Sequence, residues 1–305
     1  MSFSVRIIGN NSAVPAHNRN QTSQLVQVNN HYILIDCGEG TQMHLLRNHI
    51  KISRLRHVLI SHLHGDHYFG LIGLISTLHL FGRRYPLNIY APAPLKSIIE
   101  AQLEASETAL NFELFFHPLG LNDIRIIIDE KKYIVEAFPM KHRITCHGFR
   151  ISEKPKPIRI NKELLPEDIS IADIGTLLKG ESVLHPSGEV KYDAAYHTLP
   201  PKKSYSYAYC SDTIYDPGLV PYLRKADVLY HEATFAEDMA PRATETFHST
   251  ASQAADIAKK AEVSRLYLGH YSTRYKDPTP LLHEAKQVFD QTFLSEEGNT
   301  IILEP

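Results

Sequence analysis

A short stretch near residue 60 carries several metal-binding side chains in close succession. It reads HVLISHLHGDHYFG over residues 57–70, and its candidate ligands are His62, His64, Asp66 and His67. Neutral imidazole nitrogens and a carboxylate suit zinc. Four ligands within six positions exceed what a closed structural site would take from one segment, and further candidates follow downstream. We therefore expect two metal ions that share ligands, an arrangement suited to hydrolysis by a metal-activated water.

The elements around this stretch predict where the ligands lie. Residues 58–60 are apolar and predict a buried strand, and residues 68–80 predict an apolar helix. The four candidates then fall on the intervening loop, where Gly65 removes a side chain at a tight turn. A loop at the carboxyl end of a strand can fold its ligands inward toward an ion.

Asp36 also stands at the end of a predicted strand. Strands at 24–28 and 31–35 are joined by a predicted turn at Asn29-Asn30, and Asp36 follows the second strand. We expect Asp36 to orient a ligand histidine, and a solvated turn residue is the alternative. Thr41, which follows a glycine-rich segment, is expected to cap a helix that runs to about residue 48.

Two histidines follow the strand predicted at 133–138. His142 falls on a loop, whereas His147 falls inside the next predicted strand, 146–151, where a core or a solvated position would explain it. We therefore favour His142 as a metal ligand.

The second half of the chain places polar groups after strands in the same way. Those that directly follow a predicted strand are Asp212, Glu232 with its neighbour His231, and His270. His248 precedes a helix predicted from about residue 251 to 261, so capping is an alternative to a chemical role. A sheet-based scaffold gathers such residues at one edge, although they are distant in sequence.

Bulk properties limit the class of protein. With 305 residues, 43% of them hydrophobic, the chain can bury one large core, and we expect a single domain over residues 1–305 that carries an insertion. The 32 basic and 34 acidic residues nearly balance, so a nucleic-acid partner would be held by local patches. Three dispersed cysteines favour a reducing cytoplasm. Since no signal-peptide pattern and no apolar run of 18 residues is present, we expect no membrane segment.

The insertion is predicted at residues 152–203. This segment mixes prolines, glycines and lysines with modest apolar content, and we expect it to form an arm that is too polar to make its own core. The cations that favour an RNA clamp are Lys154, Lys156, Arg159 and Lys162 at one end and Lys179 further along.

With these residues in view, the chain resembles the metallo-β-lactamase superfamily and, within it, the ribonuclease Z family of tRNA 3′-processing endonucleases. The motifs that carry the resemblance are N-x-x-x-V-P with Arg19-Asn20, DCGEGTQ at 36–42, SHLHGDHYFGL at 61–71, His142, SDT at 211–213, HEAT at 231–234, HST at 248–250 and H-x-S-x-R-Y at 270–275. The resemblance implies an α/β fold, an αββα sandwich with an inserted flexible arm.

The resemblance also implies two zinc ions held by seven side chains. Those of the first ion are His62, His64 and His142, those of the second are Asp66, His67 and His270, and Asp212 bridges both. In the family Asp66 is also treated as the proton acceptor for the attacking water, and His248, supported by Glu232, is the acid.

Recognition of precursor tRNA is implied in the same way. The residues expected to contact RNA phosphates are Arg19, Asn20, Ser272 and Arg274. The arm corresponds to the element with which one subunit of a homodimer grips tRNA bound to the other. Here DISIADIGTLLKG replaces the Gly-Pro-rich signature usual in that arm, and Asn10-Asn11 stands where small residues are common. Cleavage would leave a 3′-hydroxyl on the tRNA and a 5′-phosphate on the trailer.

Two alternatives remain open at this point. One is a hydrolase of the same fold that acts on small phosphodiesters or sulfate esters, with an arm that serves only dimerisation. The other is a metal-bound RNA-binding protein with little turnover. The full ligand set and the acid-like His248 argue against the second alternative, since binding alone does not need an open site for two metals.

Overall fold

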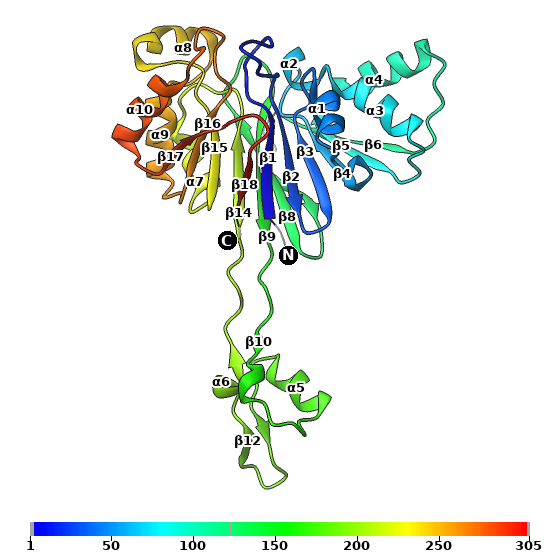
Figure 1. The fold of residues 1–305 in the computed structure, drawn as a ribbon, viewed down its shortest axis with the longest axis vertical. Coiled ribbons are helices and arrows are strands. Elements are labelled where there is room, and N and C mark those ends of the chain that lie inside the picture. Colours follow the sequence, from blue (N-terminus) through cyan, green and yellow to red (C-terminus); the bar gives the residue numbers. More distant parts are fainter. Residues whose placement is uncertain (1–2, 122–123, 304–305) are drawn as a thin grey trace. The chain divides into compact units, whose positions relative to one another are not determined.

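The computed structural model describes residues 3–121 and 124–303. The chain divides into two compact units, one formed by Met1–Ile151 with Tyr205–Pro305 and the other by Ser152–Ser204. The first unit contains two seven-stranded sheets, and helices cover the outer face of each (Figure 1). This arrangement confirms the expected αββα sandwich.

The first sheet has the strand order β18-β1-β2-β3-β4-β5-β6. Its strands are β1 (Phe3–Gly9), β2 (Ser23–Val28), β3 (His31–Ile35), β4 (Leu55–Leu59), β5 (Leu87–Pro92), β6 (Leu114–Leu119) and β18 (Thr300–Ile302). Strands β18 to β3 pair antiparallel, and β3 to β6 pair parallel. The parallel half brings the carboxyl ends of β3 and β4 to one edge.

The second sheet has the order β17-β16-β15-β14-β9-β8-β7. Its strands are β7 (Arg125–Asp129), β8 (Tyr133–Met140), β9 (Cys146–Glu153), β14 (Ser206–Cys210), β15 (Val228–Glu232), β16 (Leu266–Gly269) and β17 (Thr292–Leu294). Strands β14 to β17 are parallel, so the segments after β14, β15 and β16 also emerge at a common edge.

The helices fall into two groups that cover the two sheets. Beside the first sheet lie α1 (Thr41–Arg47), η1 (Ile52–Arg54), α2 (Gly65–Tyr68), α3 (Leu71–Leu80) and α4 (Pro94–Ala105). Beside the second lie η3 (Pro217–Leu219), α7 (Val220–Leu223), η4 (Glu237–Met239), α8 (Ala240–Thr246), α9 (Ala251–Lys260) and α10 (Thr279–Val288). Helix α9 is amphipathic, and Thr250 with Gln253 forms a capping box at its start.

The core between the sheets follows the strand period of two. Phe3, Val5 and Ile7 of β1 pack in one buried cluster with Tyr207 and Tyr209 of β14. The alternating tyrosines of β14 therefore face the interior, where their hydroxyls need partners.

Several local expectations are wrong. Asp66 and His67 lie in the short helix α2, not on a loop, and the helix predicted from residue 68 starts only at Leu71. Gly65 begins α2, where a Cβ would come within 2.2 Å of the Phe69 ring, so close packing explains the glycine. Four helical residues are too few to show a helical period, which is why the sequence pattern missed α2.

Two further corrections concern caps and strands. Gly40, with φ of 84°, is the N-cap of α1, and the Thr41 hydroxyl donates to the carbonyl of Gly38. His231 and Glu232 are the last residues of β15, so they do not follow it. The sequence analysis also overlooked β6, which has only one fully buried side chain, Leu119.

The second unit contains short elements only. They are β10 (Arg159–Ile160), η2 (Lys162–Leu164), α5 (Ile171–Leu177), β11 (Val183–Leu184), β12 (Val190–Tyr192), α6 (Ala194–His197) and β13 (Thr198–Leu199). Leu177, Val183 and Ala194 are buried together, with partly buried apolar residues around them. The expectation that this segment makes no core of its own is wrong, because its few apolar residues come together from separate short elements.

Membrane insertion through a helix finds no support in the fold. Over residues 3–121 and 124–303, no helix is both long enough and apolar enough to cross a bilayer.

Candidate metal centre

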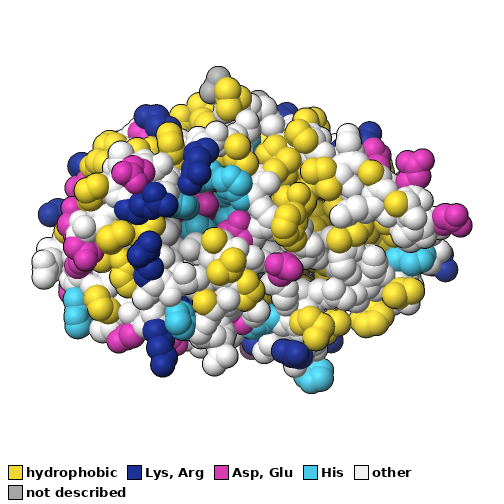
Figure 2. Space-filling model, turned by 90° about the horizontal axis from the view of Figure 1, so that it is seen from above, with side chains coloured by type: hydrophobic (Ala, Val, Ile, Leu, Met, Phe, Trp, Pro, Cys, Tyr) yellow, Lys and Arg dark blue, Asp and Glu magenta, His cyan; other side chains and the backbone are white. Residues whose placement is uncertain are grey.

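The seven predicted ligands come together at the edge where the strands of both sheets end. They form two groups, His62, His64, His142 and Asp212 in one and Asp66, His67 and His270 in the other, and Asp212 and His270 also lie close together with His248. His62 follows β4, His142 follows β8, Asp212 follows β14 and His270 follows β16. Figure 2 shows histidine and acidic side chains gathered on this face, with Lys and Arg side chains beside them.

In the first group, three imidazoles converge. Nε2 of His62 and Nε2 of His142 lie 3.0 and 3.2 Å from Nδ1 of His64. Burial lowers the pKa of His62 well below its usual value, and the neighbouring His67 lowers it further. Neutral imidazoles whose nitrogens converge are the donor set that zinc prefers.

Asp212 lies between the two groups. Its Oδ2 is 3.6 Å from Nε2 of His62, and its Oδ1 is 3.1 Å from Nε2 of His270 and 3.5 Å from Nε2 of His67. Burial alone would raise the pKa of Asp212, but the surrounding histidines, His270 first, hold it well below the usual range. Each carboxylate oxygen thus faces a different set of nitrogens.

Two buried nitrogens provide a test of whether a metal fits. Nε2 of His67 and Nε2 of His270 are buried and make no well-aligned hydrogen bond within the described part of the chain, although Oδ1 of Asp212 lies 3.5 and 3.1 Å away. Asp66 Oδ2 lies 3.4 and 3.7 Å from these atoms. Buried polar groups are normally satisfied, so a bound cation is the partner that this arrangement of nitrogens and carboxylates suits.

Asp36 bonds the ring nitrogen of His67 that does not face the other predicted ligands. Its Oδ2 accepts a hydrogen bond from Nδ1 of His67 at 2.8 Å, which leaves Nε2 to face Asp66 and Asp212. The same carboxylate accepts from the backbone N–H and hydroxyl of Ser61 and from the hydroxyl of Tyr209. Sequence reasoning proposed Asp36 but missed Ser61 and Tyr209. The inward-facing tyrosine pattern of β14 was a possible signal for Tyr209.

His248 is paired with a buried carboxylate. Its Nδ1 donates to Oε1 of Glu232 at 2.8 Å, and no hydrogen bond among the described residues uses its Nε2. Burial would lower the pKa of His248, but the Glu232 carboxylate outweighs burial and raises that pKa to about 9. The side chain is 14% exposed, so the ring remains accessible. This is the geometry of a positioned proton donor.

Thr234 connects this pair with His270, a predicted metal ligand, and sequence reasoning gave Thr234 no role. Its hydroxyl donates to Oε2 of Glu232 at 2.7 Å and accepts from Nδ1 of His270 at 3.0 Å. The second bond fixes the His270 tautomer so that Nε2 faces Asp66 and Asp212.

The residues expected to contact RNA make contacts within the protein. The Arg19 guanidinium donates to the carbonyl of Tyr275 and to Oδ1 of Asn11, and Asn20 bonds the carboxylate of Glu297. Ser272 is mostly buried, whereas the neighbouring Arg274 is exposed. Contact of these residues with substrate stays a prediction.

His147 has a structural explanation. It is fully buried in β9, and its Nε2 bonds the carbonyl of Gly120 at 2.8 Å. It belongs to neither group of candidate ligands.

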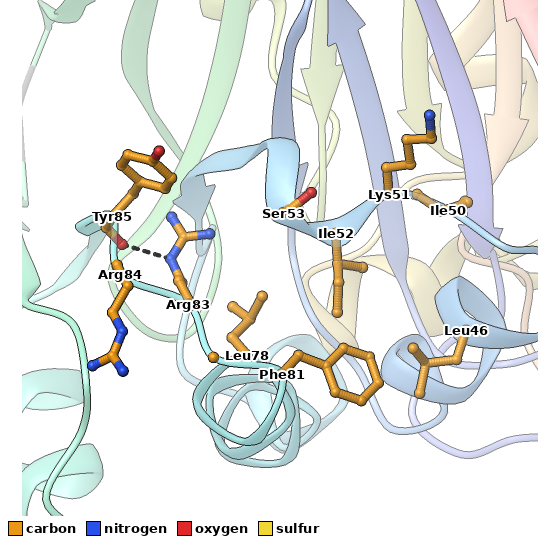
Figure 3. Close-up of a pocket in the computed structure, with 11 residues that line it drawn as sticks. Leu46, Ile50, Lys51, Ile52, Ser53, Leu78, Phe81, Arg83, Arg84 and Tyr85 are labelled. Atoms are coloured by element: carbon orange, nitrogen blue, oxygen red, sulfur yellow. Dashed lines mark hydrogen bonds between the residues drawn. The ribbon is translucent and has the colours of Figure 1, made fainter.

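A separate pocket of about 460 Å³ lies at the far end of α3. It is bounded by Leu78 in the last turn of the helix, by Phe81 directly after the helix and by Ile52 of η1. The Ile52 side chain is directed toward the Phe81 ring (Figure 3). Asp66 and His67 precede the start of α3, which at ten residues is about 15 Å long. This pocket is therefore distinct from the metal centre.

The fold and the paired His/Asp groups define a metallohydrolase of the metallo-β-lactamase type. A metallo-β-lactamase fold protein from Bacillus subtilis matches with a TM-score of 0.68 and 20% identity, over 99% of this chain and 100% of that one. Human tRNase Z, short form, matches with a TM-score of 0.73 and 26% identity, over 99% of this chain and 100% of that one.

Sequence comparison names the family. Ribonuclease Z of Cytophaga hutchinsonii is 44% identical over 300 residues, which cover 98% of this chain and 96% of the relative. A family model described as Anti-Pycsar protein Apyc1 matches residues 3–156, a region that ends before β14, β15 and β16. Because the curated relative is 44% identical over nearly the full length of both chains, the chain belongs to the ribonuclease Z family.

Proposed function

We propose that the protein is an endoribonuclease that removes the 3′ trailer from tRNA precursors. The observation that carries the proposal is the convergence of both His/Asp groups on Asp212, beside the His248–Glu232 pair. The relatives named ribonuclease Z give the substrate class. A precursor tRNA substrate and three buried free cysteines, Cys37, Cys146 and Cys210, both suit a cytoplasmic protein.

Two zinc ions complete the site in this proposal. The first would be held by His62, His64 and His142 and the second by Asp66, His67 and His270, and Asp212 would serve both. When bound, such ions lower the pKa of water and stabilise the charge that develops on the phosphate oxygens. The buried Nε2 atoms of His67 and His270, which make no well-aligned hydrogen bond among the described residues, support this loading.

The side chains have separate tasks in the reaction. Water attacks the phosphorus and Asp66 accepts its proton, while the bond to the departing 3′-oxygen breaks. Glu232 holds His248 through Nδ1, and Nε2 of His248 gives a proton to that oxygen. The tRNA keeps a 3′-hydroxyl and the trailer takes the 5′-phosphate, so no RNA 2′-hydroxyl takes part.

End-labelled precursor tRNA tests the proposal. The wild-type protein should release the trailer, a chelator should stop cleavage, and added zinc should restore it. Asp212→Asn should neither bind two zinc ions per chain nor cleave. Hydrolysis of a chromogenic phosphodiester without cleavage of tRNA would replace this proposal with the small-ester alternative. Binding of tRNA without any turnover would replace it with the RNA-binding alternative.

The Ser152–Ser204 unit serves as the tRNA-gripping arm in this proposal. Its eight basic and eight acidic residues balance overall, but they are unevenly placed. Residues 152–162 and 202–204 carry six cations and one carboxylate, and residues 163–201 carry seven carboxylates and two cations. Lys156 is paired with Glu153, whereas Lys162 and Lys202 are exposed. Phosphate contacts therefore fit the two ends of the segment.

The protein acts as a homodimer in the same proposal. Support comes from large apolar side chains that are exposed on α1 and α3, directly after α2 and on the turn after α3, namely Met43, Phe69, Leu80, Phe81 and Tyr85. Exposed apolar groups of this kind mark association surfaces. Sedimentation of the wild type and of a Leu80→Glu, Phe81→Lys variant tests this, and a wild type that sediments as a monomer would contradict it.

A further inference from the structure

Asp66 accepts a hydrogen bond from the backbone at a distant point of the chain. The N–H of Ala13 donates to Oδ2 of Asp66 at 2.9 Å. This is the same oxygen that faces Nε2 of His67 and Nε2 of His270. We infer that the Ala13 amide, clamped by Gln21, positions Asp66 for the second metal ion.

The backbone at Ala13 is in an unusual conformation. Its φ is 55°, in the left-handed region that residues with a Cβ rarely adopt, and its side chain is exposed. Packing of the Ala13 side chain therefore does not explain the conformation. Such strain persists only where the surroundings impose it, and it gathers at functional sites. Here the result of the conformation is an N–H directed at a metal-binding carboxylate.

Gln21 holds the Ala13 peptide in place. Its side chain is only 3% exposed, and both ends of its amide are used. Nε2 donates to the carbonyl of Ala13 at 2.7 Å, and Oε1 accepts from the backbone N–H of Glu39 at 2.9 Å. Gln21 thereby links the left-handed residue to the segment that follows β3.

The same loop also holds the segment that carries His270. The N–H of Ser12 donates to the carbonyl of Tyr271 at 3.0 Å, and the N–H of Tyr271 donates to the carbonyl of Asn10 at 3.0 Å. Residues 10–21 thus contact Asp66 on α2 and the residue after His270. Asp66 and His270 are both assigned to the second ion. Gln21 is therefore a positioning residue whose effect should fall on that ion.

The inference rests on the proposed function, in which Asp66 and His270 are metal ligands. The test compares Gln21→Met, Ala13→Val and Ala13→Gly with the wild type. Gln42→Met is the matched control, because it removes a glutamine whose side chain bonds the Thr77 hydroxyl instead of the Ala13 peptide. Stepwise zinc affinities are measured by competition with a chromogenic chelator. The free energy of unfolding of each metal-free protein and the kcat and KM for precursor tRNA are measured alongside.

Gln21→Met and Ala13→Val should weaken the second zinc by about 10- to 100-fold, the usual effect of losing a group that orients a ligand. The first zinc and KM should change little, and kcat should fall. Ala13→Gly keeps the amide and accepts the same φ, so it should lose far less affinity than Ala13→Val. Gln42→Met should bind both ions as the wild type does.

The outcomes separate this inference from the proposed function. A wild-type protein that does not bind two ions would contradict the proposed metal centre itself. If the wild type binds two ions and both Gln21→Met and Ala13→Val keep full affinity for the second, the positioning role is wrong. Equal weakening of both ions, together with a loss of metal-free stability, would also overturn it, since that result indicates general damage.

Discussion

The Tyr209 hydroxyl donates a hydrogen bond of 2.7 Å to Oδ2 of Asp36. The two residues belong to different sheets, because Tyr209 lies in β14 and Asp36 follows β3. The same carboxylate oxygen accepts from Nδ1 of His67. One hydrogen bond from the second sheet therefore helps to orient His67, a predicted metal ligand that follows a strand of the first sheet.

We expect Tyr209→Phe to lower metal affinity by roughly 10-fold, because Asp36 loses one of the donors that hold it against His67. Tyr207→Phe is the matched control, since this equally buried tyrosine of β14 bonds Gln24 instead of Asp36. Both variants should lose about 1 kcal/mol of unfolding free energy, the usual contribution of one hydrogen bond. Chelator competition and denaturant unfolding measure the two effects. Equal metal affinity in the two variants would contradict the role given to Tyr209.

A second prediction concerns the proton donor. His248→Ala should fold, keep its zinc and bind precursor tRNA, but cleave about 100-fold more slowly or worse, since general acid catalysis is lost. His283→Ala, which removes an exposed histidine of α10, should cleave at the wild-type rate. Single-turnover cleavage of labelled precursor measures the rate of the chemical step. Near-normal cleavage by His248→Ala would leave His248 only a structural role before α9.

There is a physical reason why the sequence predicted a set of residues that the structure brings together. Asp212 and His270 each follow an apolar run, and parallel strands that end at one edge bring such residues together. The hydrogen bonds that orient these residues correspond to no pattern of residue types in the sequence. Tyr209 and Asp36 are 173 positions apart, and Ala13 and Asp66 are 53 apart. The first pairing depends on how the two sheets face each other, and the second joins the segments that follow β1 and β4 of one sheet. Local periodicity records neither relationship.

A third prediction concerns pH and a histidine outside the metal centre. His57 of β4 is 5% exposed, and burial, followed by the charges of His31 and Arg56, lowers its pKa to about 4. The unfolded value is about 6.5, so above pH 6.5 the group is neutral in both states. As the pH falls from 6.5 to 4, the unfolded chain takes up a proton that the folded protein does not. Stability should therefore fall by about 3 kcal/mol over that window.

His57→Gln should remove this part of the pH dependence. Denaturant unfolding with a chelator present, at intervals from pH 7.5 to 4.5, gives the difference between wild type and variant at each pH. That difference isolates His57, because the ligand histidines titrate in both proteins. His49→Asn, at an exposed position, should follow the wild-type curve. Parallel curves for the wild type and His57→Gln would show that His57 is protonated in the folded protein as readily as in the unfolded chain.

The last prediction concerns where the arm holds tRNA. Cations gather at residues 152–162 and 202–204, and the remainder of the arm is acidic, with Lys191 already paired to Asp173 at 3.1 Å. Each phosphate contact contributes about 0.7 to 0.9 to the slope of log affinity against log salt. Lys162→Ala with Lys202→Ala should therefore weaken precursor binding and reduce that slope by roughly 1.4 to 1.8.

Lys179→Ala with Lys191→Ala is the matched control, since it removes two cations from the acidic part of the same arm. It should leave the slope nearly unchanged, because carboxylates surround these positions and repel phosphate. Binding is measured at several salt concentrations with saturating zinc, and hydrolysis of a chromogenic phosphodiester reports on the metal centre in each variant. That hydrolysis should be equal in all of them, because neither pair contributes a metal ligand. If the slope of log affinity against log salt falls more in the Lys179, Lys191 variant, the RNA contact lies on the DISIADIGTLLKG side of the arm. If the slope is unchanged in both variants, the arm does not bind tRNA through these lysines.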